Sequence, residues 1–189
     1  MMSDVIKFYR MADEFGAFSN FSRHEVKYKG KVWKTSEHAF QAQKFPNNPE
    51  IQKQIQKAST PSVAARIGRD RSNPLREDWE SAKDQVMYDV LRAKFTQHQE
   101  LYNLLLSTGY REIVEHTEND HYWADGGDGS GKNMLGILLM KLRQELRDQR
   151  DYSEASKHMA EQICKEIDDE ILQKLQESHD GLTEIKYES

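Results

Sequence analysis

One helix can be located directly in the stretch Thr35-Ser36-Glu37-His38-Ala39-Phe40-Gln41-Ala42-Gln43-Lys44-Phe45. The hydroxyl of Thr35 or of Ser36 can accept the first free backbone N–H groups of a helix, so either residue can serve as its cap. Pro46 and Pro49 follow, and proline neither continues a helix nor tolerates one directly before it. The pattern therefore predicts a helix from about residue 35 to residue 45.

A polar stripe runs along this predicted helix. Glu37, Gln41 and Lys44 are separated by four and then three residues, so they share one face, bordered by Phe40 and Phe45. A glutamate in a first turn also interacts favourably with the helix dipole. The spacing alone favours a solvated helix face over one wall of a polar site.

The flanking segments predict a mainly helical α+β fold around a small, mainly antiparallel sheet. Thr60, Pro61 and Gly68 have the order expected for a cap, a first helical residue and a residue just past a helix end. A Lys29-Gly30 turn predicts a hairpin. The expected strands are residues 5–9, 25–28, 31–34 and 112–116, and the expected helices are residues 35–45, 49–58, 61–67, 78–95, 100–107 and 133–147.

Charge divides the chain into two parts. Residues 151–189 carry eleven acidic and four basic side chains, which leaves 23 basic and 21 acidic residues in the first 150. We therefore expect one near-neutral domain over residues 1–150 and an acidic helical C-terminal extension over residues 151–189. Apolar residues recur every four positions in the extension, which predicts packing on the main domain, on a protein partner or on a second copy: Met159, Ile163, Ile167, Ile171 and Leu175.

Composition excludes several classes of protein. Hydrophobic residues make up 37% and charged residues 31%, and no apolar run is long enough to cross a bilayer, so we expect a globular protein without membrane attachment. Cys164 is the only cysteine, which excludes an internal disulfide and a thiolate zinc site and favours a cytoplasmic location. A near-neutral main domain argues against non-specific DNA coating, whereas a few arginines can still bind a small anion.

The glycine-rich segment after residue 115 predicts a close approach of backbone to a ligand. Residues 126–132 match GxxxxGK, but Asn133 replaces the Ser or Thr that binds magnesium, and Asp125 and Asp128 would repel phosphates. The carboxylates also lack the spacing of a calcium loop. His116 and His121 are a weak metal pattern, so we expect no metal site and no cofactor.

Two further groups of residues are candidates for ligand binding. Arginine side chains suit phosphates, and the nearby Trp79 offers a face for a base or a sugar; the alternative is a helix end with salt bridges to neighbouring acids. Asn20 between Phe18 and Phe21 is either a base-binding platform or a corner of the core. The arginines are Arg66, Arg69, Arg71 and Arg76.

Four motifs follow one another along the chain: Phe18-Ser19-Asn20-Phe21, Thr35-Ser36-Glu37-His38, Ala64-Ala65-Arg66-Ile67-Gly68-Arg69, and the segment from Glu115 to Gly136. In this order they resemble the NADAR family, and most closely its YbiA-like N-glycosidase branch. The resemblance covers residues 6–146 and implies a compact α+β fold and hydrolysis of N-glycosidic bonds. The implied substrates are ribosylamino-pyrimidine intermediates of riboflavin synthesis and ADP-ribose attached to guanine bases, in a nucleotide or in nucleic acid.

The resemblance also implies roles for single residues. Glu37 matches the family's catalytic glutamate, and Trp79, Asp120 and Trp123 match active-site positions. Ala124 stands where close relatives have glycine, and we expect its methyl group to narrow the turn or the substrate range. The expected catalytic residues are Glu37, Lys44 and Asp120, and the expected substrate-binding residues are Asn20, Phe21, Gln41, Arg66, Arg69, Trp79, Trp123, Gly126, Gly127 and Asn133.

The sequence leaves the mechanism open. Glu37 can stabilise a ribosyl cation or deprotonate water while Asp120 positions the ribose hydroxyls or the water. Alternatively, the Lys44 amine can attack the anomeric carbon and form a Schiff base. The main alternative function is a module that binds ADP-ribose or nucleotides without cleaving them.

Overall fold

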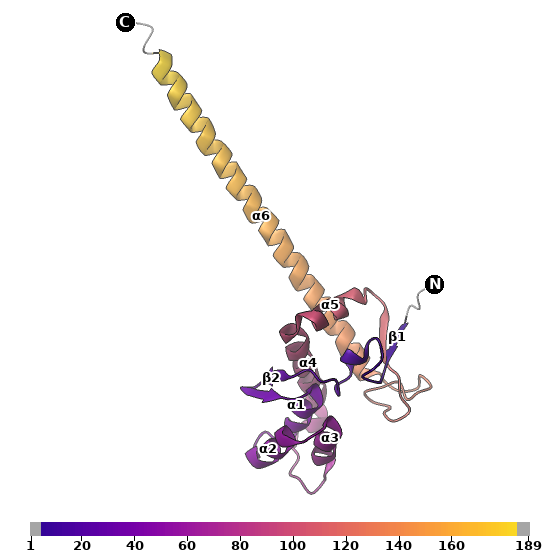
Figure 1. Ribbon diagram of the computed structural model, residues 1–189. Helices are drawn as coiled ribbons and strands as arrows, with labels where there is room; N and C mark the ends of the chain where they lie inside the picture. The colour runs from indigo at the N-terminus through magenta and orange to yellow at the C-terminus, as the bar shows by residue number, and fades with distance from the viewer. Residues whose placement is uncertain (1–4, 185–189) are drawn as a thin grey trace. The chain divides into compact units, whose positions relative to one another are not determined.

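The computed structural model describes residues 5–184, with side chains through residue 172, in two compact units that divide after Glu145 (Figure 1). The elements follow one another as β1 (Val5–Phe8), the 3-10 helix η1 (Gly16–Phe18), β2 (Val26–Tyr28), β3 (Lys31–Trp33), α1 (Ser36–Ala42), α2 (Pro49–Lys57), α3 (Pro61–Arg69), α4 (Trp79–Gln97), α5 (Gln99–Ser107), β4 (Glu112–Glu115) and α6 (Met134–Glu184). The first unit is therefore mainly helical α+β, as predicted.

The starts of the first three α-helices are fixed by side-chain caps. The Thr35 hydroxyl accepts from the His38 backbone N–H, the Asn48 amide oxygen from that of Ile51 at 3.1 Å, and the Thr60 hydroxyl from that of Val63 at 3.2 Å. Each bond satisfies one of the backbone donors that a helix start leaves free. The capping residues that the sequence indicates for α1 and α3 are confirmed.

The strands do not form the one small, mainly antiparallel sheet that we expected. They form two separate two-stranded sheets: β2 and β3 pair antiparallel, and β1 pairs parallel with β4 in the register Val5 to Glu112 and Phe8 to Glu115. Lys29 and Gly30 both have positive φ angles, 48° and 73°, which is the backbone of a tight hairpin turn. Local turn chemistry therefore fixes β2–β3, whereas the β1–β4 pairing depends on tertiary structure.

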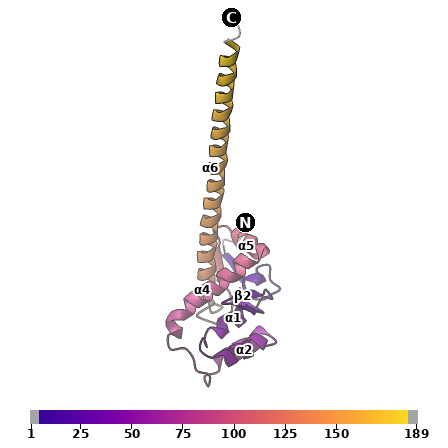
Figure 2. The same cartoon turned by 90° about the vertical axis from the view of Figure 1, so that its left-hand side faces the viewer.

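Helix α1 lies at the centre of the first unit. It contacts α2, α3, α4 and the β2–β3 hairpin, and in the view of Figure 2 it lies between α4 and α2. All seven of its residues are buried, including Glu37 and Gln41. The interpretation of this polar stripe as a solvated face is therefore wrong, because α2, α3, α4 and the β2–β3 hairpin pack around the helix.

Helix α6 is longer than expected. The sequence predicts one helix over residues 133–147 and another in the tail, but α6 runs without a break from Met134 to Glu184 because no glycine or proline interrupts residues 148–152. Met159, Ile163, Ile167 and Ile171 are each at least half exposed, and the Leu175 side chain lies outside the described residues. Packing of this stripe on another surface stays a prediction. In the described part of the chain, no helix has an apolar segment long enough for a bilayer.

We expect a chain that ends at Arg150 to fold and to keep its full kcat/KM, because every residue that lines the cavity described below precedes residue 124. Circular dichroism, sedimentation and turnover of the full and shortened chains check this. If the full chain is an oligomer, and the shortened chain is both a monomer and inactive, the tail instead supports the site through self-association.

Candidate active site

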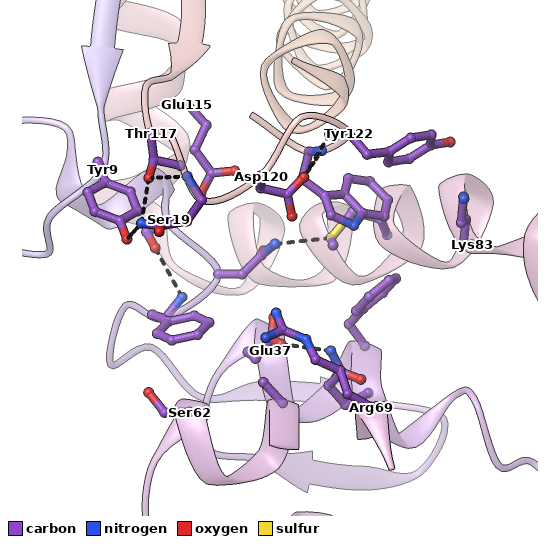
Figure 3. Close-up of a pocket in the computed structure, with 18 of the residues that line it drawn as sticks. Tyr9, Ser19, Glu37, Ser62, Arg69, Lys83, Glu115, Thr117, Asp120 and Tyr122 are labelled. Atoms are coloured by element: carbon purple, nitrogen blue, oxygen red, sulfur yellow. Dashed lines mark hydrogen bonds between the residues drawn. The ribbon is translucent and has the colours of Figure 1, made fainter. Parts of the chain in front are cut away.

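A cavity of about 800 Å³ opens between α1, α3, α4 and the loops after β1 and β4. Its volume is in the range of small-molecule sites. Figure 3 shows Glu37 and Arg69 on one side and Glu115 and Asp120 on the opposite side. The cavity is lined by Tyr9, Arg10, Met11, Ser19, Asn20, Phe21, Glu37, Phe40, Gln41, Lys44, Ser62, Ala65, Arg69, Trp79, Glu80, Lys83, Met87, Glu115, Thr117, Asn119, Asp120, Tyr122 and Trp123.

Glu37 is held in the first turn of α1 by two hydrogen bonds. Its backbone N–H donates to the Asn20 carbonyl at 3.0 Å, and its carboxylate accepts from the Gln41 amide at 2.8 Å. Only 6% of Glu37 is exposed, and this burial raises the pKa of its carboxyl, against the opposing effects of the Gln41 hydrogen bond and the charge of Arg69. Glu37 is thus an oriented carboxylate with increased basicity in a ligand-sized cavity.

Gly68 of α3 leaves the space that Gln41 occupies. A Cβ atom on Gly68 would lie 2.0 Å from the Gln41 Oε1 atom, whereas backbone atoms are farther away. A side chain at residue 68 would therefore displace Gln41 from its position beside Glu37. The glycine of the Ala64–Arg69 motif acts on the site through Gln41.

We expect Gly68→Ala to keep the fold and to lower kcat/KM about tenfold, because a displaced Gln41 no longer donates to the carboxylate, a hydrogen bond worth about 1.5 kcal/mol. Turnover and thermal unfolding check this. In the double variant with Gln41→Ala, the second change should add no further loss, since both remove the same hydrogen bond. If the losses in kcat/KM of the two single variants add fully in the double variant, Gly68 does not act on Glu37 through Gln41.

Lys44 lies on the same face of the site as Glu37. Its amine donates to the Gly68 carbonyl at 3.1 Å and lies 5.4 Å from the centroid of the Trp79 ring. Burial lowers the pKa of Lys44, although the charge of Glu37 opposes the shift. A larger fraction of this amine is consequently neutral and nucleophilic than of an exposed lysine.

An aromatic wall borders the two groups. The ring of Phe40 lies 5.1 Å from that of Trp79 and 5.4 Å from that of Trp123, centroid to centroid. Asp120 fixes Trp123 in place, because its Oδ1 atom accepts the backbone N–H groups of Tyr122 at 2.8 Å and of Trp123 at 2.7 Å. Both bonds use Oδ1, so Oδ2 of Asp120 is available to a ligand.

Two buried amide oxygens and an exposed arginine add further polar groups at the cavity. Within the described residues, the side-chain oxygens of Asn20 and Gln41 are buried without a hydrogen-bond partner. Arg69 is exposed and makes no salt bridge within the described part of the chain. A guanidinium in this state suits a phosphate. These residues and Phe21 are placed at the cavity as the sequence predicts.

Four predicted binding residues do not line the cavity. Arg66 lies in a shallow neighbouring depression that shares Ser62 and Arg69 with the cavity. The Asn133 side chain links β4 to the start of α6, accepting from the Glu115 N–H at 3.0 Å and donating to the Ile113 carbonyl at 2.8 Å.

Gly126 and Gly127 have positive φ angles of 74° and 81°. Added Cβ atoms would meet the side chains of His121 and Glu118, respectively, so these glycines shape the loop. The Ala124 side chain is fully buried and does not line the cavity, so the structure gives its methyl group no direct contact with a ligand.

Sequence reasoning did not single out Glu115 or Lys83, both of which line the cavity. Glu115 ends β4, where Ile113 and Val114 are buried and Glu112 is exposed. Glu112 and Glu115 lie three residues apart and so on opposite faces of the strand, but the sequence does not show which face meets the cavity. That depends on the pairing of β4 with β1.

Comparisons with known proteins agree with this geometry. The family model described as the NADAR domain matches residues 7–147. The chain is 57% identical over 146 residues to N-glycosidase YbiA of Escherichia coli, an alignment that covers 77% of this chain and 91% of that protein. It is 42% identical over 158 residues to the chloroplastic riboflavin biosynthesis protein PYRR of Zea mays, covering 76% of this chain and 25% of that protein. An NMR structure of Escherichia coli YbiA superposes with a TM-score of 0.73 at 56% identity, covering 79% of this chain and 89% of that one.

Proposed function

This chain belongs to the NADAR family, and from that premise we propose that it is an N-glycosidase that hydrolyses the bond between a ribose carbon and a nitrogenous base or amine. The observation that carries the proposal is the buried Glu37 carboxylate, oriented by Gln41 and facing a cavity with Trp79 and Trp123. Cleavage of a ribosyl C–N bond builds positive charge at the anomeric carbon, and a fixed anion beside that carbon stabilises the transition state.

The other residues supply binding and orientation. The indole rings of Trp79 and Trp123 offer faces on which a base or a ribose can stack. The free Oδ2 atom of Asp120 accepts from a ribose hydroxyl or from the attacking water. Arg69 binds a phosphate at the mouth of the cavity, and Arg66 in the adjoining depression provides a second cation for a longer phosphate chain.

The proposed substrate is a ribosylated base that carries phosphate. Two kinds fit: ADP-ribose attached to a guanine base, and a ribosylamino-pyrimidine phosphate of riboflavin synthesis. The relatives named as an N-glycosidase and as a riboflavin biosynthesis protein support N-glycosidase chemistry and a connection with riboflavin. A cavity of about 800 Å³ accommodates nucleotide-sized ligands of either kind.

Two routes use the same residues. In direct hydrolysis, Glu37 takes the proton of the water that attacks the anomeric carbon. In the covalent route, the Lys44 amine attacks that carbon in the ring-opened sugar, the C–N bond to the base or amine breaks as that group leaves with a proton, and water then hydrolyses the Schiff base to release the sugar and restore Lys44. Borohydride reduction during turnover distinguishes them: a stable ribosyl adduct on Lys44 supports the covalent route, and an active Lys44→Arg variant without an adduct supports direct hydrolysis.

The substrate class is tested by incubating the wild-type chain, without added metal, with an ADP-ribosylated guanine oligonucleotide and separately with a ribosylamino-pyrimidine phosphate. Release of free ADP-ribose from the first assigns a de-ADP-ribosylating role, and cleavage of only the second assigns a metabolite-clearing role. Binding of both ligands without cleavage of either would overturn the proposed activity.

A further inference from the structure

Hydrolysis at this site requires a proton donor as well as an anion. When the C–N bond breaks, its electron pair stays on the departing nitrogen, which must be protonated unless it leaves as a neutral group. Glycosidases divide these tasks between two carboxyl groups on either side of the scissile bond. Glu37 fills one of the two positions, and the wall opposite Glu37 carries two more carboxyl groups, those of Glu115 and Asp120 (Figure 3).

We propose that Glu115 is a further catalytic residue of this site, the general acid that protonates the leaving base. This inference rests on the N-glycosidase activity proposed above. Glu115 lines the cavity from the end of β4, on the side opposite Glu37. Its backbone is fixed, because its N–H donates to Asn133 at 3.0 Å and its carbonyl accepts from Asp125 at 2.9 Å. Its carboxyl group accepts no hydrogen bond and makes no salt bridge within the described residues.

The three carboxyl groups have different surroundings, which assigns their roles. Burial raises the pKa of Glu37, but the hydrogen bond from Gln41 and the nearby charges of Arg69 and Lys44 oppose that rise and favour its ionised form. Asp120 already accepts two backbone N–H groups, which a carboxylate does best. Glu115 has neither kind of support, so it is the carboxyl group that keeps its proton.

Electrostatics agrees with a protonated Glu115. Burial raises the pKa of Glu115 to about 8, and the neighbouring negative charges of Asp120, Glu37 and Asp125 add to the rise. Asp125 itself is paired with His116 at 2.7 Å. The cations that line the same cavity are Arg10, Lys44, Arg69 and Lys83.

The proposed step balances without any further reactant. Glu115 gives its proton to the departing nitrogen, the C–N bond breaks, and a water oxygen bonds to the anomeric carbon. Glu37 takes the proton released by that water. At the end Glu115 is ionised and Glu37 is protonated, and exchange of one proton with solvent restores both groups.

The test compares leaving groups. With a substrate whose base must be protonated to leave, Glu115→Gln should lower kcat/KM about 100- to 10,000-fold, the contribution of a positioned acid. With a ribosyl pyridinium, whose leaving group departs neutral, the same variant should lose less than about tenfold. Glu37→Gln should lose activity on both. The matched control is Glu112→Gln, an exposed glutamate on the same strand, which should behave as wild type.

The pH profile provides the second measurement. Wild-type kcat/KM should fall as pH rises above about 8, because the acid form of Glu115 is lost there, and Glu115→Gln should lack this basic limb. Equal losses on both substrates, near-normal turnover by Glu115→Gln or an unchanged basic limb would each overturn the assignment while leaving the N-glycosidase activity standing. A wild-type chain that cleaves no N-riboside would instead overturn the proposed function itself.

Discussion

Glu37→Gln is expected to lower kcat/KM about 100- to 10,000-fold, the usual range for loss of a positioned acid or base. Glutamine keeps the shape of the side chain and can still meet the Gln41 amide, but it carries no charge to stabilise a ribosyl cation and accepts no proton from water. Because the native carboxyl is buried with a raised pKa, removal of its charge should not destabilise the fold. Steady-state turnover and thermal unfolding of the same samples measure both effects.

Glu50→Gln is the matched control for this variant. Glu50 occupies the same position in the first turn of α2 that Glu37 occupies in α1, but its side chain is exposed and does not line the cavity. Its replacement tests the general effect of removing an acid from a helix start, worth about 0.3–1 kcal/mol. Near-normal turnover by a folded Glu37→Gln enzyme would remove Glu37 from the mechanism.

Lys94→Met is expected to have the largest effect on stability, about 3 kcal/mol from three hydrogen bonds of about 1 kcal/mol each. Lys94 is fully buried, and its amine donates to the carbonyls of Ala17 and Ser19 and, at 2.6 Å, to the Ser22 hydroxyl. Burial lowers the pKa of Lys94 to about 7. Methionine keeps an unbranched side chain that lacks only the terminal amine position, so the loss reports mainly the hydrogen bonds.

The same variant should also weaken catalysis. The residues held by Lys94 flank Asn20, whose carbonyl accepts the Glu37 backbone N–H at 3.0 Å. Urea unfolding should therefore show a lower midpoint, and turnover should fall even where the protein is folded. Lys53→Met, at an exposed position of α2, is the control and should stay within about 0.5 kcal/mol of wild type. An equally or more stable Lys94→Met chain would show that the cost of burying the amine exceeds its hydrogen bonds.

Local sequence features correctly predicted the helix starts and the hairpin. Thr35, Thr60 and the Lys29-Gly30 turn act through atoms only a few residues away, so their chemistry is readable without tertiary structure. The ordered motifs also led to nine residues that the structure gathers around the cavity. These are Glu37, Lys44, Asp120, Asn20, Phe21, Gln41, Arg69, Trp79 and Trp123.

Features that depend on contacts between distant segments were not predictable in the same way. The parallel pairing of β1 with β4 joins two segments that lie far apart in the sequence, and it brings Glu115 to the wall of the cavity. The burial of α1 follows from the packing of α2, α3 and α4 around it, which the polar stripe of Glu37, Gln41 and Lys44 does not reveal. The place of Arg66 outside the cavity follows from the orientation of α3, which sequence spacing does not specify.

A time course of substrate and products by NMR measures whether this cavity breaks a ribosyl C–N bond. The wild-type chain is expected to release free base together with an equal amount of ribose phosphate from a ribosylamino-pyrimidine phosphate, or of ADP-ribose from ADP-ribosylated guanine. Glu37→Gln is expected to bind the same compound and to leave it intact. Saturable binding of both compounds by the wild-type chain, with no product from either, would instead identify the cavity as a binding site without catalysis.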